Sequence, residues 1–183
     1  VNNNNLLEIP NVIMEASMLW GLGLNNNSIS TLPFGLFKTN IVELQLSGNR
    51  LTNLPNEISQ LHSLKYLELQ NQAIKSIPEE IGLASKLVTI DIRNNSVELL
   101  PNNIHNLQHL EYLYLYGNPL CSKSNWFKSD APKETKGMID SVSGRCDKHC
   151  SPYCTDDQLQ QTYTCFDGCN SPQCNFQNGV CTK

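Results

Sequence analysis

Residues 110–118 read LEYLYLYGN, and this stretch decides the fold. Its leucines alternate with polar and aromatic residues, which is typical of a short strand with one buried side and one exposed side. The spacing L-x-x-L-x-L-x-x-N recurs upstream with small substitutions, and successive copies are 22 or 23 residues apart. The upstream copies begin at Leu19, Ile41, Leu64 and Leu87. We therefore expect five short strands, one in each repeat.

Prolines mark the other half of each repeat. Each of five prolines follows an apolar residue, and they are Pro10, Pro33, Pro55, Pro78 and Pro101, spaced by 23, 22, 23 and 23 residues. The apolar residues three positions later predict a second buried row, made of Ile13, Leu36, Ile58, Ile81 and Ile104. A period of this length indicates stacked units, each of which buries its aliphatic side only against its neighbours.

This frame resembles the leucine-rich repeat family over about 120 of the 183 residues. The resemblance implies an α/β fold, a right-handed leucine-rich repeat solenoid with a parallel concave sheet and convex turns or short helices. It also implies a ladder in which a turn asparagine bonds to backbone groups of adjacent repeats. The matching asparagines are Asn27, Asn49, Asn95 and Asn118, whereas Gln72 departs by one methylene. Residues 1–10 already form the second half of a repeat, so we expect the array to begin upstream.

The outward strand positions are expected to form the concave face, where such solenoids usually bind partners. Along this face small residues give way to tyrosines, and acidic residues occupy the middle. Tyrosine provides a large, stiff contact area and is enriched at interfaces. We predict the partner-binding residues Tyr66, Glu68, Asp91, Arg93, Tyr112, Tyr114 and Tyr116. The alternative is that the tyrosines only pack against cross-strand neighbours and the acids only keep the surface soluble.

We expect this face to serve an extracellular protein-recognition module, within a receptor ectodomain or a secreted binding protein. An acidic rim with aromatics suits a basic protein segment, and aromatics alone equally suit a carbohydrate. A secreted leucine-rich repeat inhibitor of a partner enzyme is the alternative function. The net charge of −4 argues against nucleic acid as a partner. No apolar run approaches the roughly 20 residues of a membrane-spanning helix, so we expect no membrane insertion by this segment.

Nothing in the sequence predicts an enzyme or a cofactor. No nucleophile elbow, P-loop or dinucleotide fingerprint is present. His105 and His109 have the spacing of a zinc-protease helix, but Asn106 stands where the general base would be. Glu68 and Asp91 on neighbouring strands are similar to the paired acids of glycoside hydrolases, although we expect an open face rather than a pocket. We therefore expect no catalytic residue and no metal site.

The cysteines divide the chain. All eight lie between Cys121 and Cys181, and an even number in so short a stretch indicates disulfide bonds and an oxidising, extracellular location. Zinc binding is the competing interpretation, but only His149 lies nearby. We predict repeats over 1–120, a disulfide-stapled cap over 121–146 and a small disulfide-rich module over 147–183.

Both cysteine-rich parts resemble known modules. The first resembles the C-terminal cap of extracellular leucine-rich repeat proteins, which implies a Cys121–Cys146 disulfide and places Trp126 over the last repeat. The last six cysteines resemble a degenerate Lin-12/Notch repeat, and this implies the pairs Cys150–Cys174, Cys154–Cys165 and Cys169–Cys181. The sequence alone allows fifteen pairings of six cysteines.

The Notch-type family binds calcium through an Asp-Gly-Gly-Asp segment, and residues 177–180 are Gln-Asn-Gly-Val here. We expect weak calcium binding or none, because two anionic ligands are missing. Two Asn-x-Ser sequons predict glycosylation at Asn26 and Asn94, although such triplets are frequent by chance in a chain this rich in asparagine.

Overall fold

The structure is a computed structural model that describes residues 1–16, 18–122 and 126–127. All of these residues belong to the first of two compact units, Val1–Arg145. The Cys121–Cys146 pairing, the Notch-like module over 147–183, its disulfides and its calcium binding lie outside the described residues.

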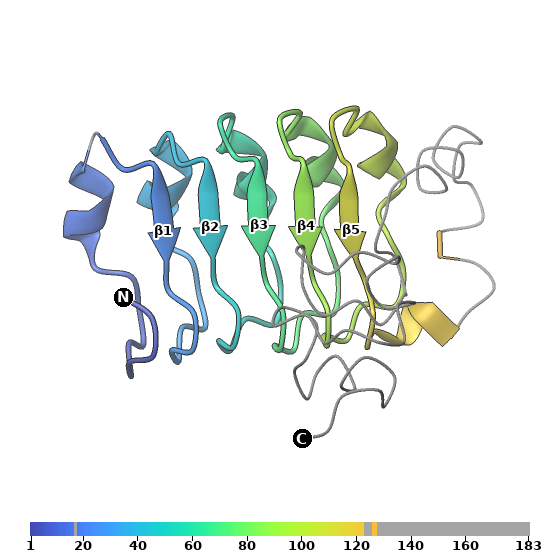
Figure 1. Cartoon of the computed structure of the whole chain (residues 1–183), viewed down its shortest axis with the longest axis horizontal. Helices are drawn as coiled ribbons and strands as arrows, with labels where there is room; N and C mark the ends of the chain where they lie inside the picture. The colour runs from blue at the N-terminus through green and yellow to red at the C-terminus, as the bar shows by residue number, and fades with distance from the viewer. Residues whose placement is uncertain (17, 123–125, 128–183) are drawn as a thin grey trace, which may run out of the picture. The chain divides into compact units, whose positions relative to one another are not determined.

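A parallel sheet of five three-residue strands forms one side of the described unit (Figure 1). The strands follow each other in sequence order and are β1 (Gly21–Gly23), β2 (Glu43–Gln45), β3 (Tyr66–Glu68), β4 (Thr89–Asp91) and β5 (Tyr112–Tyr114). Equivalent positions of the repeats pair with each other, since the central residues Leu22, Leu44, Leu67, Ile90 and Leu113 lie in one register. The leucine spacing thus predicted both the strands and their alignment, and the solenoid fold is confirmed.

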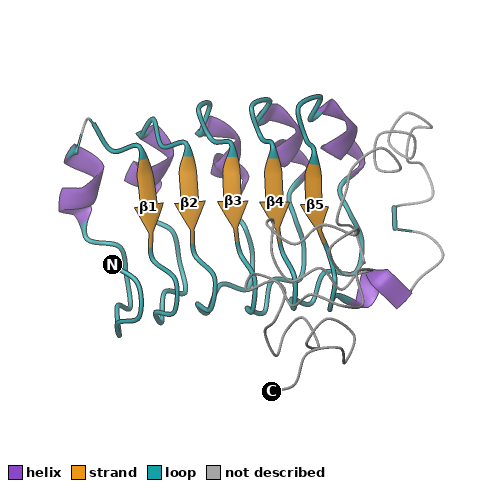
Figure 2. Cartoon of the chain, viewed as in Figure 1, coloured by secondary structure: helices purple, strands orange, loops and turns teal. Residues whose placement is uncertain are grey.

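Short 3₁₀ helices form the other side of each repeat (Figure 2). They are η1 (Asn11–Glu15), η2 (Phe34–Lys38), η3 (Asn56–Gln60), η4 (Glu79–Leu83) and η5 (Asn102–Asn106). A further 3₁₀ helix, η6 (Pro119–Ser122), follows β5 and lies apart from this row (Figure 2). Each of the first five follows one of the repeated prolines, whose backbone is extended. Proline suits this place because its φ is already fixed. It also lacks a backbone N–H, but an N–H at the start of a helix has no partner within the helix. The prolines therefore set where each convex helix begins.

The core fills the space between the strands and the helices. The strand leucines and isoleucines are at most 5% exposed, from Leu22 to Leu115. Leu36, Ile58, Ile81 and Ile104 on the convex side are fully buried, as predicted. Ile13 was expected in the same row but is only half-buried. Its helix, η1, has a neighbouring helix on one side only within the described residues, so half of the packing is missing there.

An asparagine ladder ties the repeats together. Asn95 Oδ1 accepts the backbone N–H of Ile74, in the preceding repeat, at 3.0 Å. Its Nδ2 donates to the carbonyls of Leu69 at 2.8 Å and Ile92 at 3.0 Å. Equivalent bonds are made by Asn27, Asn49 and Asn118. These side chains are 5–7% exposed, and they satisfy strand-end backbone groups that would otherwise be buried without partners.

Candidate recognition surface

The side chains that alternate with the buried leucines line up in columns across the sheet. The first column is Gly21, Glu43, Tyr66, Thr89 and Tyr112, and the second is Gly23, Gln45, Glu68, Asp91 and Tyr114. A third column, Asn25, Ser47, Gln70, Arg93 and Tyr116, follows where the strands end. The structure therefore brings the predicted binding residues onto the same face, with neighbours one strand apart.

Arg93 holds Asp91 firmly on this face. Its Nε lies 2.9 Å from Oδ1 and 3.1 Å from Oδ2 of Asp91, and its Nη2 also contacts Oδ2. The backbone N–H of Arg93 donates to Oδ1 at 3.1 Å, and its Nη2 donates to Gln70 Oε1 at 3.3 Å. Charge-assisted, forked contacts of this kind fix both partners, so the pair is a rigid part of the surface.

The tyrosines cluster at the C-terminal strand, but they are not equally exposed. Tyr112 and Tyr114 stack with their ring centres 6.1 Å apart, and the Arg93 guanidinium lies 5.2 Å from the centre of the Tyr114 ring. Tyr112 is 37% exposed, whereas Tyr114 is 3% exposed. The alternation of the strand had predicted an outward, exposed side chain for Tyr114. The Tyr112 ring and the Arg93 guanidinium both contact the Tyr114 ring, and burial raises the pKa of Tyr114 to about 12.

Asp91 and Arg93 are also less exposed than predicted, at 2% and 5%. Each satisfies the other's charge, which is the condition under which such groups are found buried. Apart from Tyr112 on β5, the more exposed charged and aromatic side chains of the strands on the concave face consequently lie on β2 and β3. We call Glu43, Gln45, Tyr66 and Glu68 the β2–β3 patch; Tyr66 is 39% exposed and the other three are half-buried.

Negative charge accumulates in the β2–β3 patch. Gln45 Nε2 donates to Glu43 Oε1 at 2.8 Å, and the Gln45 side chain also bonds to Glu68. Burial raises the pKa of the Glu68 carboxyl, and the neighbouring carboxylates Asp91 and Glu43 raise it further. The bond from Gln45 and the charge of Arg93 oppose this pKa increase. One neutral amide therefore separates two carboxylates that repel each other.

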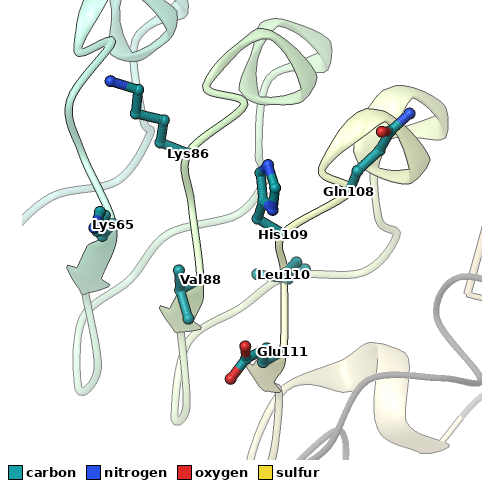
Figure 3. A pocket seen from close by; sticks show the side chains of 7 residues that line it. All are labelled: Lys65, Lys86, Val88, Gln108, His109, Leu110 and Glu111. Carbon is teal, nitrogen blue, oxygen red and sulfur yellow. The ribbon is translucent and has the colours of Figure 1, made fainter.

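A shallow hollow of about 400 Å³ lies where the chain enters β3, β4 and β5 (Figure 3). Its lining is Lys65, Lys86, Val88, Gln108, His109, Leu110 and Glu111. Figure 3 shows Glu111 beside the start of β5 and the ammonium group of Lys86 pointing away from it. The hollow was not predicted from the sequence. Its signal is the shared repeat position of Lys65, Val88 and Glu111, one residue before each strand.

The two histidines that resembled a zinc-protease pair do not share a helix. His105 lies on η5, where its Nδ1 is 2.7 Å from the carbonyl oxygen of Asn102. The helix ends at Asn106, and His109 lines the hollow instead. A five-residue helix that ends between them removes the i, i+4 geometry that such a metal site needs.

The sequon asparagines Asn26 and Asn94 are exposed and belong to a second amide column. Their backbone φ values are 55° and 54°, in the left-handed region. Asn26 Nδ2 donates to Asn3 Oδ1 at 2.8 Å, and Asn94 Nδ2 donates to Asn71 Oδ1 at 2.9 Å. The left-handed residues of this column are Asn3, Asn26, Gly48, Asn71, Asn94 and Gly117. Asparagine and glycine tolerate this conformation best, which explains why only these two types occur there.

The end of the described stack contacts the beginning of the cysteine-rich part. The backbone N–H of Leu100 donates to the carbonyl oxygen of Trp126 at 2.7 Å, and Trp126 and Phe127 are half-buried. Cys121 is disulfide-bonded, and its partner lies outside the described residues. No helix within the described residues is long and apolar enough to cross a membrane.

Parallel strands, proline-initiated convex helices and an asparagine ladder define a leucine-rich repeat solenoid. Residues 41–124 match the family model of a leucine-rich repeat region. Mouse podocan is 33% identical over 129 residues, which is 67% of this chain and 20% of podocan. Human oligodendrocyte-myelin glycoprotein is 37% identical over 57 residues, 31% of this chain and 13% of that protein. A probable serine/threonine-protein kinase of Dictyostelium discoideum matches 48% of this chain, but the match covers 3% of the kinase. The chain thus spans only a small part of these relatives.

Solved structures that resemble the chain are also leucine-rich repeat proteins. A leucine-rich repeat protein of Leptospira interrogans superposes with a TM-score of 0.65 at 33% identity, over 76% of this chain and 34% of that one. The leucine-rich repeat ectodomain of the Arabidopsis thaliana receptor kinase GASSHO1/SCHENGEN3, solved in complex with Casparian strip integrity factor 2, superposes with a TM-score of 0.58 at 30% identity. That match covers 64% of this chain and 15% of the ectodomain. The chain is therefore similar to binding modules, and none of these matches shows a catalytic family.

Proposed function

We propose that this chain is part of an extracellular recognition protein that binds a protein or peptide on its concave face. The observation that carries the proposal is the β2–β3 patch, in which a 39% exposed tyrosine and two carboxylates lie together on a sheet face. Exposed aromatic side chains set among fixed polar groups are typical of interface centres. Tyr112, the other exposed tyrosine, extends the same column two strands further.

Three further observations support an extracellular recognition role. A similar solenoid, the GASSHO1/SCHENGEN3 ectodomain, was solved with a bound factor. The cysteine-rich end of the chain is typical of an oxidising compartment, and Cys121 is disulfide-bonded. The receptor ectodomain and the myelin glycoprotein among the similar proteins point to the same location. A cap over 121–146, a Notch-type module over 147–183 and glycans on Asn26 and Asn94 are part of this proposal.

The test uses the full chain and a random-peptide display library, with a glycan array in parallel. Peptides selected on the wild type are measured against a Tyr66→Ala, Tyr112→Ala variant and against Phe34→Ala. Phe34 is a matched control, because it is an aromatic residue that is 56% exposed on the convex helix η2. Removing an interface aromatic commonly weakens binding by about tenfold or more. We expect that loss in the tyrosine variant alone. A loss on Phe34→Ala alone, or glycan binding without peptide binding, contradicts the proposal.

A further inference from the structure

The concave face carries more negative charge than its own cations neutralise. Among the outward positions of the described strands and the column that follows them, Arg93 is the only cation, whereas Glu43, Glu68 and Asp91 are acidic. Arg93 is engaged with Asp91 through both carboxylate oxygens. Of the causes that shift the pKa of Glu68, the charge of Arg93 is the smallest. Glu43 and Glu68 are thus left without a cationic partner on this face.

Gln45 occupies the place that a cation would take. Its amide group donates to Glu43 Oε1 at 2.8 Å and also bonds to Glu68. A neutral amide offers hydrogen bonds but no compensating charge, so the repulsion between the two carboxylates persists. An arginine or lysine side chain offers both, and charge-assisted hydrogen bonds are roughly twice as strong as neutral ones.

The surroundings of the two acids suit a peptide chain. Tyr66 lies directly beside Glu43 across the β2–β3 pair, and the face of an exposed tyrosine attracts a guanidinium or ammonium group. On the other side of β2, Gly21 and Gly23 present no side chain. A Cβ at Gly21 would lie 3.5 Å from Glu43, and a Cβ at Gly23 would lie 3.3 Å from Gln45 and from Asn2, so the side chains of β2 border the two glycines. Backbone can approach closely where glycines line a sheet.

One polar group on the same face is unsatisfied. Ser47, in the third column two residues after Gln45, is 9% exposed, and its Oγ has no hydrogen-bond partner in the structure. A buried hydroxyl without a partner is unfavourable by about 1–3 kcal/mol. The described residues contain no group of three or more ligating side chains that could hold a metal ion, so an organic cation fits this surface better than a metal ion.

We infer that the partner presents a basic peptide segment whose lysine or arginine side chain sits between Glu43 and Glu68, with its aliphatic stem against Tyr66. This inference rests on the proposed function and specifies its partner. Arginine fits best, because its planar fork can bond to two acceptors while its flat face stacks on the tyrosine. Binding then displaces the Gln45 amide and places one positive charge between the two acids, which reduces their repulsion.

The experiment selects a random-peptide display library on the immobilised full chain. The strongest peptide is compared with a version in which every lysine and arginine is replaced by glutamine, using isothermal titration calorimetry at low and high salt. Both peptides are also titrated into Glu43→Gln, Glu68→Gln and into Glu57→Gln, Glu80→Gln. The second variant is the matched control, since it removes the same charge from the convex helices η3 and η4. Thermal unfolding of each variant checks that the fold is intact.

We expect the selected peptides to be enriched in lysine and arginine. The neutral peptide should bind at least about tenfold more weakly, and the double variant Glu43→Gln, Glu68→Gln should lose a similar amount of affinity. Binding should also weaken at high salt. The convex control should bind as the wild type does. Selected peptides that are neutral or acidic, yet lose affinity in the Tyr66→Ala, Tyr112→Ala variant, overturn the basic partner and leave the concave site standing. Peptides whose affinity changes in neither concave variant overturn the proposed function itself.

Discussion

The side chain of Gln72 reaches the backbone of the preceding repeat as a ladder asparagine does, because its Oε1 accepts the N–H of Leu51 at 3.1 Å. Its Nε2 donates to the Leu69 carbonyl at 3.2 Å. Within the described residues it lacks the further bond to a carbonyl of the preceding repeat that Asn49, Asn95 and Asn118 make. Gln72 is also half-buried, whereas these asparagines are buried. The longer side chain thus preserves the ladder but weakens it.

Replacing Gln72 by asparagine should therefore stabilise the protein. We expect Gln72→Asn to raise the free energy of unfolding by about 1 kcal/mol, the net value of one hydrogen bond. Asn95→Ala should lower it by about 2–4 kcal/mol, since it leaves buried groups of Ile74, Leu69 and Ile92 without partners. Urea unfolding followed by circular dichroism measures both. A destabilising Gln72→Asn would show that the glutamine geometry is optimal in this repeat.

Glycines on the two sides of the solenoid should respond differently to alanine. A Cβ at Gly82 in η4 would overlap the backbone oxygen of Asn103 in the next helix, whereas a Cβ at Gly21 would meet Glu43 at an ordinary 3.5 Å. Because backbone atoms cannot easily move aside, we expect Gly82→Ala to destabilise the protein by about 1–3 kcal/mol. Gly21→Ala should stay within about 0.5 kcal/mol of the wild type. Equal melting temperatures for the two variants would contradict this close helix packing.

The sequence predicts the repeating fold better than it predicts the burial of individual side chains. The spacing of the leucines and prolines predicted the strands, their register and most of the buried convex row, because periodicity determines which side of a repeat is buried. It did not predict that Tyr114 is buried, since that depends on the Arg93 and Tyr112 side chains beside it. Nor did it predict that Ile13 is half-buried, since η1 has a neighbouring helix on one side only within the described residues and no local pattern contains this.

The second amide column was also missed, although its signal is present. Asn3, Asn26, Gly48, Asn71, Asn94 and Gly117 recur with the same period as the leucines. Only Asn26 and Asn94 among them carry a further signal, as sequons. Their left-handed backbone shows that the residue type is set by conformation, which a search for aliphatic repeats does not detect.

Ionisation of Glu68 should oppose folding. Because burial and its acidic neighbours raise the pKa of Glu68 in the folded state, the folded chain holds this proton to higher pH than the unfolded chain. Stability therefore falls as pH rises from the ordinary glutamate range through the raised pKa. We expect Glu68→Gln to increase stability by roughly 0.5 kcal/mol at neutral pH and to have little effect below about pH 4. Melting temperatures across this range test it, and a destabilised Glu68→Gln at neutral pH would argue against the repulsion.

Tyr114 should ionise late in an alkaline titration. Burial raises its pKa from 10.0 to about 12, whereas Tyr66 and Tyr112 are far more exposed. Since the folded state keeps this proton longer, the stability that depends on Tyr114 is lost as pH rises through that range. Tyrosinate absorbance in an alkaline titration should show one late step that disappears in Tyr114→Phe. An unchanged titration curve in that variant would mean that another tyrosine is responsible.

The location of the binding site is tested most directly by photo-crosslinking. p-Benzoylphenylalanine is introduced at Tyr66 on the concave sheet or at Phe34 on the convex side, two aromatic positions that are 39% and 56% exposed. Each protein is irradiated with the basic peptide selected from the library, and crosslinked chain is measured by mass spectrometry. A crosslink from position 66 and none from position 34 is the predicted result. A crosslink from position 34 alone would place the partner on the convex side and contradict a concave recognition surface.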